Sequence, residues 1–197
     1  MDKLIEELFK VFSHLAREIQ AYVFSGFILL LNIFLIDFIY YDSFLWDAIK
    51  GHSFLTWIFV IICYILGQFA LALYAFLLEF TRLDLWLQTR IFKSRFTSIN
   101  NFTDENTVLD KATILKKDER LYFHFIERNV NLTVMRWNFS SAFLLISIVD
   151  FIYLTKEYHC KILIVGLVSL FISWCFLILS IFTQKENADQ ISKLKTL

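Results

Sequence analysis

The chain contains no proline, has no net charge, and has three cysteines among its 197 residues. Since 19 Lys and Arg balance 19 Asp and Glu, no overall electrostatic field draws nucleic acid to the protein. Cys63 and Cys175 fall inside apolar runs and Cys160 stands alone in a short loop, so the cysteines do not form a disulfide framework. They are typical of small apolar filling residues.

Motifs for catalysis or cofactor binding are also missing from the sequence. It has no glycine-rich phosphate loop, no paired Cys motif and no Ser-His-Asp arrangement. His52, His159 and Cys160 are too few for a metal site. The carboxylates and histidines that an intramembrane lipid-modifying enzyme would cluster at headgroup level are lacking as well. We therefore expect a protein that is not an enzyme, holds no cofactor or metal, and does not bind nucleic acid sequence-specifically.

Apolar residues, in contrast, are abundant. They make up 58% of the chain, 23 of them are Phe, and the mean hydropathy is +0.60, which exceeds what a soluble core of this size could bury. A bilayer crossing needs about 20 apolar residues at about 1.5 Å each. Four runs have that length, so we predict an all-α integral membrane protein with four transmembrane helices, at residues 21–41, 54–80, 138–154 and 162–182.

Residues 1–20 are predicted to form an amphipathic helix at the membrane surface. Apolar residues recur there at steps of three and four, and no cleavable signal-peptide pattern is present, so we expect the first span to be retained as an anchor. The helix is expected to lie in the cytoplasmic headgroup region and to turn into the first span. The alternative is a helix that simply continues the first span into solvent.

The distribution of Lys and Arg predicts the orientation in the membrane. Residues 1–20 hold three, 82–137 hold ten and 183–197 hold three, against three in the two other connecting segments. Because basic residues are retained on the cytoplasmic side, both termini and residues 82–137 are expected there. The abundance of Phe, Ile, Leu, Asn and Lys without Pro indicates an A+T-rich genome, and we predict a bacterial inner-membrane protein. Trp86 and Trp137 are expected to mark the inner membrane boundary.

A repeated tetrapeptide suggests that the chain contains two related halves. Asp37-Phe38-Ile39-Tyr40 and Asp150-Phe151-Ile152-Tyr153 are identical and lie at the outer ends of the first and third spans. We predict a duplicated helical hairpin, the alternative being a chance match in a Phe- and Ile-rich chain. The predicted segments are an interfacial helix at 1–20, transmembrane hairpins at 21–81 and 138–183, a cytoplasmic helical connector at 82–137, and a tail at 184–197.

The connector is the part with room for a partner-binding surface. Residues 82–96 are expected to continue the second span as a helix, 97–106 to break the pattern, and 118–137 to form a helix that runs into the third span. Asp118 is the predicted N-cap of that last helix. The basic residues expected to contact lipid headgroups or a partner are Arg90, Lys93, Arg95, Lys116, Lys117 and Arg128.

Four polar residues fall at membrane depth, where unpaired charge is costly. Asn32 and Gln68 lie nearest the middle of their spans, and Asp37 and Asp150 lie about a turn from the outer ends. One interpretation places them along an outer vestibule or pore that attracts cations. The other has the aspartates reaching water or capping a loop, with Asn32 and Gln68 as interhelical hydrogen-bond partners.

Together, the amphipathic start, the four spans and the basic connector from Arg82 to Trp137 resemble the small membrane accessory proteins of type VI CRISPR loci and other bacterial antiviral systems. The resemblance covers the whole chain as architecture and includes no diagnostic motif. It implies a homo-oligomer that modulates an RNA-guided effector or perturbs the inner membrane, with lipids and a cytoplasmic protein or ribonucleoprotein as partners. It transfers no residue roles.

Two functions therefore remain open from the sequence. The first is a self-associating, non-enzymatic accessory or effector protein of antiviral defence. The alternative is a small-solute or ion channel or transporter built from two hairpins, with the four polar residues at membrane depth lining its path. Liposome flux without a partner would favour the second function.

Overall fold

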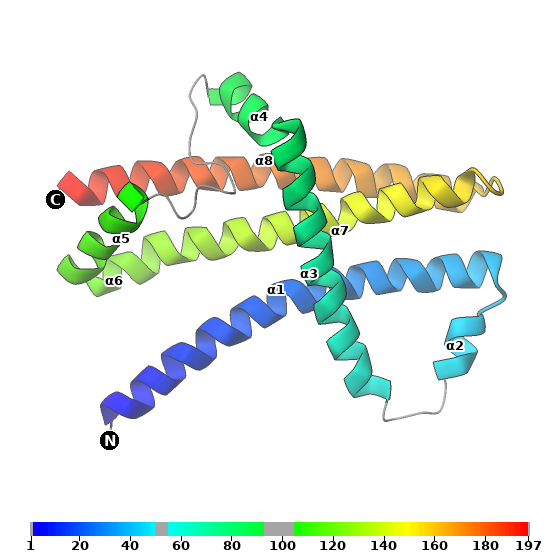
Figure 1. Cartoon of the computed structure of the whole chain (residues 1–197), viewed down its shortest axis with the longest axis horizontal. Coiled ribbons are helices and arrows are strands. Elements are labelled where there is room, and N and C mark those ends of the chain that lie inside the picture. Colours follow the sequence, from blue (N-terminus) through cyan, green and yellow to red (C-terminus); the bar gives the residue numbers. More distant parts are fainter. Residues whose placement is uncertain (1, 50–54, 93–104, 197) are drawn as a thin grey trace. The chain divides into compact units, whose positions relative to one another are not determined.

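Helices joined by short turns make up the residues that the structure describes, which are 2–49, 55–92 and 105–196 of a computed structural model (Figure 1). No strand occurs in these ranges. The elements are α1 (Asp2–Tyr40), α2 (Phe44–Ile49), α3 (Leu55–Thr81), α4 (Leu83–Phe92), α5 (Glu105–Lys117), α6 (Glu119–Leu121), the π-helix η2 (Tyr122–Glu127), α7 (Arg128–Leu154) and α8 (Cys160–Thr196).

Four helical segments are long and apolar enough to cross a membrane, which confirms the predicted all-helical, four-span class. They are Ala21–Tyr40, Ile58–Thr81, Glu119–Leu154 and Cys160–Leu194. Large apolar side chains stand exposed along them, for example Phe69 at 62% and Phe171 at 68%. A soluble protein would bury such surface, and a bilayer provides the apolar solvent that it needs.

The first helix differs from the prediction at its start. Asp2–Tyr40 is one uninterrupted helix, so the expected turn between an interfacial helix and the first span is wrong. The alternative of a helix that continues the span holds, because nothing in this proline-free stretch interrupts the backbone hydrogen bonds. The side chains of residues 2–18 lie outside those described, and the amphipathic character of this stretch stays a prediction.

The second span ends at Thr81, within one residue of the prediction, but the helix does not continue beyond it as expected. Arg82 has φ of 50°, in the left-handed region, and this residue separates α3 from α4. Residues 82–96 are therefore not a straight continuation of the span. Residues 93–104, which include most of the predicted break at 97–106, lie outside the described residues.

The helix predicted to begin after Asp118 is confirmed. Asp118 Oδ1 accepts hydrogen bonds from the backbone N–H of Arg120 at 2.9 Å and of Leu121 at 3.1 Å. This N-cap satisfies donors that the first helical turn leaves free. From Glu119 the chain stays helical to Leu154 through the six-residue π-helix η2, so the connector runs directly into the third span as expected.

One compact unit comprises residues 1–71 and 141–173. Within it α1 crosses α3 where glycines replace side chains. A Cβ on Gly26 would overlap the Cys63 carbonyl and lie 2.9 Å from Cys63 Cα, and a Cβ on Gly67 would lie 2.7 Å from Ser25 Oγ. Such close backbone approach at small residues is typical of helices packed in membranes. The apolar core of this unit is formed by Leu29, Ala70, Ala142 and Ile146.

The second compact unit comprises residues 72–140 and 174–197. Its core brings α5, η2 and α8 together through Ile114, Ile126 and Ile191. Tyr74 on α3 and Ser140 on α7 share a hydrogen bond of 2.7 Å between their hydroxyl oxygens. Trp137 is 3% exposed and Trp86 is 57% exposed, and their predicted place at the inner membrane boundary stays a prediction.

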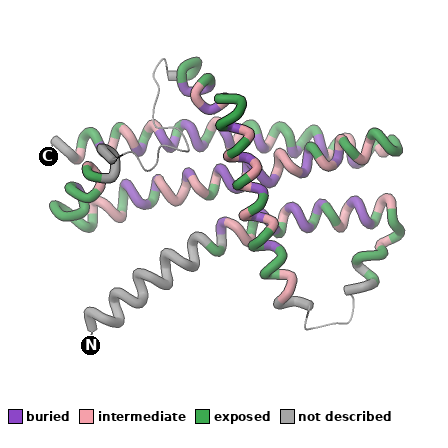
Figure 2. Tube along the Cα trace, in the orientation of Figure 1, coloured by how far each residue is buried: buried purple, intermediate pink, exposed green. Residues whose placement is uncertain are grey.

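Small and polar side chains fill much of the protein's interior. The buried face of α8 recurs at steps of three and four residues, the spacing of one helix face, and Figure 2 shows buried positions recurring along α7 and α8. Apolar side chains gain little by moving from lipid into the protein, so close packing and interhelical hydrogen bonds hold membrane-spanning helices together. The buried α8 positions at this spacing are Ile162, Gly166, Ser169, Ser173, Leu177, Ser180, Gln184, Asn187 and Ile191.

Candidate functional site

A hydrogen bond inside the first unit joins two of the four polar residues that were predicted at membrane depth. Asn32 on α1 donates from Nδ2 to Oδ1 of Asp150 on α7 at 2.9 Å. Asp150 is completely buried and Asn32 is 6% exposed. The other oxygen of each group, Asn32 Oδ1 and Asp150 Oδ2, is buried without a hydrogen-bond partner among the described residues. A carboxylate and an amide thus meet through one hydrogen bond, and one oxygen of each has no partner among the described residues.

Gly166 on α8 forms one wall of this site. A Cβ at position 166 would lie 3.2 Å from Asp150 Cβ and 3.7 Å from Asp150 Oδ2. The glycine therefore lets the α8 backbone approach the carboxyl group closely. A side chain at position 166 would occupy the space beside the oxygen that has no partner.

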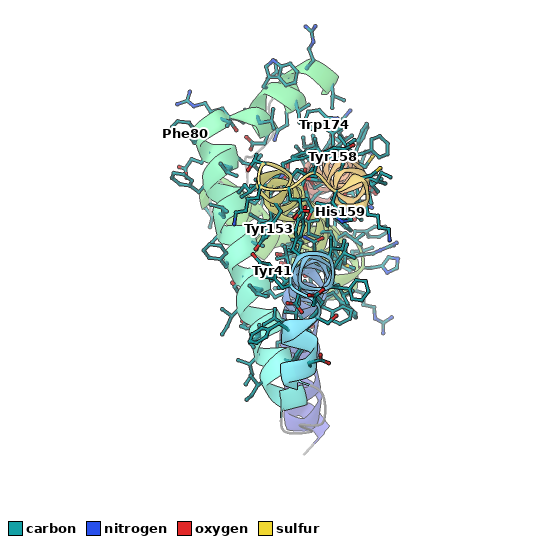
Figure 3. The ribbon with its side chains drawn as sticks, turned by 90° about the vertical axis from the view of Figure 1, so that its right-hand side faces the viewer. Tyr41, Phe80, Tyr153, Tyr158, His159 and Trp174 are labelled. Carbon is teal, nitrogen blue, oxygen red and sulfur yellow. The ribbon has the colours of Figure 1, made fainter. Side chains whose placement is uncertain are left out.

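An aromatic cluster covers the end of the first unit, one helical turn beyond Asp150. Tyr40 donates its hydroxyl to the Glu157 carbonyl oxygen at 2.8 Å, and its ring centroid lies 5.4 Å from that of Tyr153 and 5.9 Å from that of His159. Figure 3 looks onto this end of the molecule, where Tyr41, Tyr153 and His159 are labelled. The cluster ties the end of α1 to the turn between α7 and α8.

Asp37 does not join the pair, although its local sequence is the same as that of Asp150. Its Oδ2 accepts a hydrogen bond from the Leu45 N–H at 2.9 Å, and its carbonyl oxygen accepts from Tyr41 and Ser43. Asp37 therefore holds the turn into α2, which is the loop-capping role considered for it. The two aspartates of the repeated tetrapeptide differ in their partners, and the duplication itself stays a prediction.

Gln68 is also separate from the pair. Its Nε2 donates to the hydroxyl oxygen of Tyr64, one turn away on the same helix, at 3.2 Å. Interhelical hydrogen bonds were expected for both Asn32 and Gln68. The expectation is confirmed for Asn32 and is wrong for Gln68, whose hydrogen bond stays within α3. The structure brings Asn32 and Asp150 together and leaves Asp37 and Gln68 apart from them.

The predicted basic surface lies on the second unit. Arg90 on α4, Lys116 and Lys117 at the end of α5, and Arg128 at the start of α7 are all exposed. The two lysines end α5 and Arg128 begins α7, and Ile114 of α5 and Ile126 of η2 share one apolar cluster; the exposed acidic residues Asp118 and Glu119 lie between them in the sequence. Figure 1 draws α4, which carries Arg90, as an arm apart from α5 and α6. Lys93 and Arg95 lie outside the described residues.

Lys111 of α5 does not belong to this exposed group, because it is partly buried. Lys111 is half-buried, and desolvation lowers its pKa below the ordinary lysine value. It therefore belongs to the packed side of α5. We define the basic corner as Lys116, Lys117 and Arg128.

Buried amides in the second unit were missed by sequence reasoning. Gln88 on α4 donates to Gln184 Oε1 on α8 at 3.3 Å, and Asn129 on α7 donates to Gln190 Oε1 on α8 at 3.0 Å. Arg136 donates to the Leu179 carbonyl oxygen at 3.0 Å. The available signal was the spacing of Ser180, Gln184 and Asn187 at steps of four and three along α8, which places polar groups on one face.

The described residues contain no group of three or more His, Cys, Asp or Glu side chains that could hold a metal ion. Comparison of the chain with protein-family models, with curated proteins and with solved structures finds no match. The arrangement itself thus offers two sites with different chemistry. One is a buried acid and amide pair between helices, and the other is an exposed basic corner.

Proposed function

We propose that the protein is a multi-pass bacterial inner-membrane protein that acts by binding a partner and not by catalysis. The observation that carries this proposal is the basic corner, where three cations stand exposed on a packed helical corner. Each Lys or Arg near an anionic surface contributes about 1 kcal/mol of attraction. Asp118 and the contact between Ile114 and Ile126 hold the backbone that bears these cations.

Orientation follows from the same charges. With residues 82–137 in the cytoplasm, the basic corner and both termini face the cell interior and the turn between α7 and α8 faces outward. Cys160 stands exposed at the start of α8, whereas Cys63 is buried and Cys175 is partly covered. A membrane-impermeant maleimide should therefore label intact cells at Cys160, and Cys160→Ser should abolish the labelling. Labelling of Cys160 only after permeabilisation would reverse the orientation.

The proposed partner follows from the accessory role of the proteins that this architecture resembles. We infer a cytoplasmic protein or ribonucleoprotein that docks on the basic corner, and an output through the spans that perturbs the membrane. Self-association is proposed from the resemblance to the accessory proteins, and the apolar surface of α3, of which only 22% of the most apolar window is buried within the chain, is surface that either lipid or a second copy can cover. A symmetric ring of copies in detergent would be expected, and a monomer would contradict this part of the proposal.

Charge reversal tests the basic corner. Cells would carry the chain together with an RNA-guided type VI effector and its target RNA, and a voltage-sensitive dye would report membrane depolarisation. Wild type should depolarise the cells, and the triple variant Lys116→Glu, Lys117→Glu, Arg128→Glu should not. The matched control reverses Lys156 and Lys161 at the other end of the spans and should behave as wild type. Depolarisation by the triple variant would remove the basic corner from the mechanism.

A channel or transporter is the second candidate, and the contact between Asn32 and Asp150 favours it. Buried ionisable residues between transmembrane helices are typical of ion and proton paths. Purified protein in liposomes should then carry ions without any partner. Flux that is lost in Asp150→Asn but kept in the basic-corner triple variant would favour this function over the accessory role.

A further inference from the structure

The surroundings of Asp150 do not compensate a negative charge on its side chain. The side chain is completely buried, its one hydrogen-bond partner is the neutral amide of Asn32, and it makes no ion pair among the described residues. A buried carboxylate is stable when a cation or several donors compensate its charge. Here one N–H donor serves one oxygen, and Oδ2 has none.

The two atoms without partners complement each other if one proton is added. An ionised carboxylate accepts hydrogen bonds only, whereas a carboxylic acid also donates one, and an amide oxygen accepts. A proton on Asp150 Oδ2 can therefore be donated to Asn32 Oδ1 while Asn32 Nδ2 continues to donate to Asp150 Oδ1. The acid and the amide then form a paired ring of two hydrogen bonds, and both buried oxygens gain a partner.

We propose that Asp150 and Asn32 form a proton-binding site between α1 and α7. Uptake transfers one proton from water to Oδ2, forms the O–H bond and changes the charge of the side chain from −1 to 0. Release returns the proton to water and leaves an anion between the two helices. Because the pair is a direct polar link from α1 to α7, the proton holds the two helices together.

A metal cation fits the site less well than a proton. Hard cations such as Ca²⁺ and Mg²⁺ take about six or more oxygen ligands. The pair has two oxygens without partners, and Gly166 brings the α8 backbone close to one of them. A proton needs no more than the acceptor that Asn32 supplies.

Few titratable groups face Asp150 from the surrounding elements. From α1, Asp37 is held by the Leu45 N–H, and Tyr40 is bound to the Glu157 carbonyl oxygen. On α7 itself Tyr153 lies one turn beyond, in the aromatic cluster with His159 from the turn. The adjoining α8 position is Gly166, which cannot titrate.

The aromatic cluster lies one helical turn beyond Asp150, toward the end of the unit, and the hydrogen bond from Tyr40 to the Glu157 carbonyl oxygen holds it in place. Lys156 does not neutralise the carboxylate, because its Nζ lies 5.1 Å from the centre of the Tyr153 ring, in the turn beyond the cluster. This inference concerns the spans alone and does not depend on partner binding at the basic corner.

Isotope-edited infrared spectroscopy tests the proposal on the full-length protein in lipid nanodiscs. With ¹³C-labelled aspartate, wild type at neutral pH should show the carbonyl band of a buried protonated carboxylic acid. The band should disappear in Asp150→Asn, remain in the control Asp37→Asn, and shift in Asn32→Leu because the acceptor is lost. Absence of the band in wild type, or its persistence in Asp150→Asn, would overturn the proposal.

Two measurements on wild type remain decisive whether or not the variants fold, and a third uses Asp150→Asn. Raising the pH should remove the band from wild type, and the helix contact should weaken with it. Adding Na⁺ at constant pH should leave the band unchanged, and a loss of the band with Na⁺ would identify a metal site instead. Asn at position 150 reproduces the hydrogen bonds of the protonated acid, so Asp150→Asn should keep the same thermal midpoint across the pH range in which wild type loses stability.

Discussion

The crossing of α1 and α3 at Gly26 predicts the sign of the stability change in Gly26→Ala. The substitution should stabilise an exposed helix and destabilise a close crossing of two helices. In an exposed helix, Gly→Ala stabilises by about 1 kcal/mol because alanine has the higher helix propensity. Here the new Cβ would overlap the Cys63 carbonyl, a backbone group that cannot rotate away. Overpacking costs about 1 to 3 kcal/mol, and a backbone overlap belongs at the upper end of that range. We expect Gly26→Ala to destabilise the α1–α3 contact by about 2 kcal/mol after the propensity gain.

Cys63 reports directly on this contact, because its side chain is 3% exposed and lies where α1 crosses α3. In a background of Cys160→Ser and Cys175→Ser it is the sole thiol of the chain. A membrane-permeant maleimide reacts when the contact opens, at a rate that follows the open population. A cost of about 2 kcal/mol raises that population about 30-fold.

The matched control is Gly166→Ala in the same background. Its Cβ would meet Asp150 Cβ at 3.2 Å on a different pair of helices, so the reactivity of Cys63 should stay within a few-fold of the parent, as expected for an independent site. If Gly26→Ala leaves the labelling rate unchanged or lowers it, α1 and α3 do not approach at Gly26, and this part of the fold is wrong.

Three further substitutions probe local packing by thermal unfolding in detergent, followed by circular dichroism. Asp118→Ala should lower stability by about 0.5 to 2 kcal/mol through loss of the N-cap, and Asp118→Asn should retain it. Ile126→Ala should cost about 2 to 5 kcal/mol, because Ile126 is completely buried in the core of the second unit; a cost near zero would place it at the surface. Tyr74→Phe should cost about 0.6 kcal/mol and at most about 1.7, the range for hydrogen bonds between membrane helices. Ser140→Ala should then add little in the double variant, and additive effects would contradict the hydrogen bond between them.

Features of the sequence that act locally were predictable. The four spans follow from the length of each apolar run, which depends on no other part of the chain. The Asp118 cap follows likewise from the position of one side chain relative to the next three residues. That α1 is one continuous helix was harder to predict, because residues 1–20 have the pattern of an interfacial helix. Whether a turn separates them from the span depends on what surrounds them.

The buried face of α8 could not be predicted from hydrophobic periodicity. Lipid-facing positions such as Phe171 are apolar, but so are buried ones such as Ile162 and Leu177. Apolar residues therefore occur all around the helix and indicate no direction. The buried face becomes visible only through small and polar residues such as Ser173 and Gln184, once the structure shows which positions are covered.

The sequence by itself determined that the chain has four helices long and apolar enough to span a membrane, because the length of an apolar run is a sum over neighbouring residues. It could not determine which polar side chains meet. Asp37 and Asp150 begin the same tetrapeptide, yet one holds a turn and the other pairs with Asn32, 118 positions away. Only the packing of α1, α7 and α8 decides that difference, since a hydrogen bond between helices depends on which faces come together and not on the local sequence of either residue.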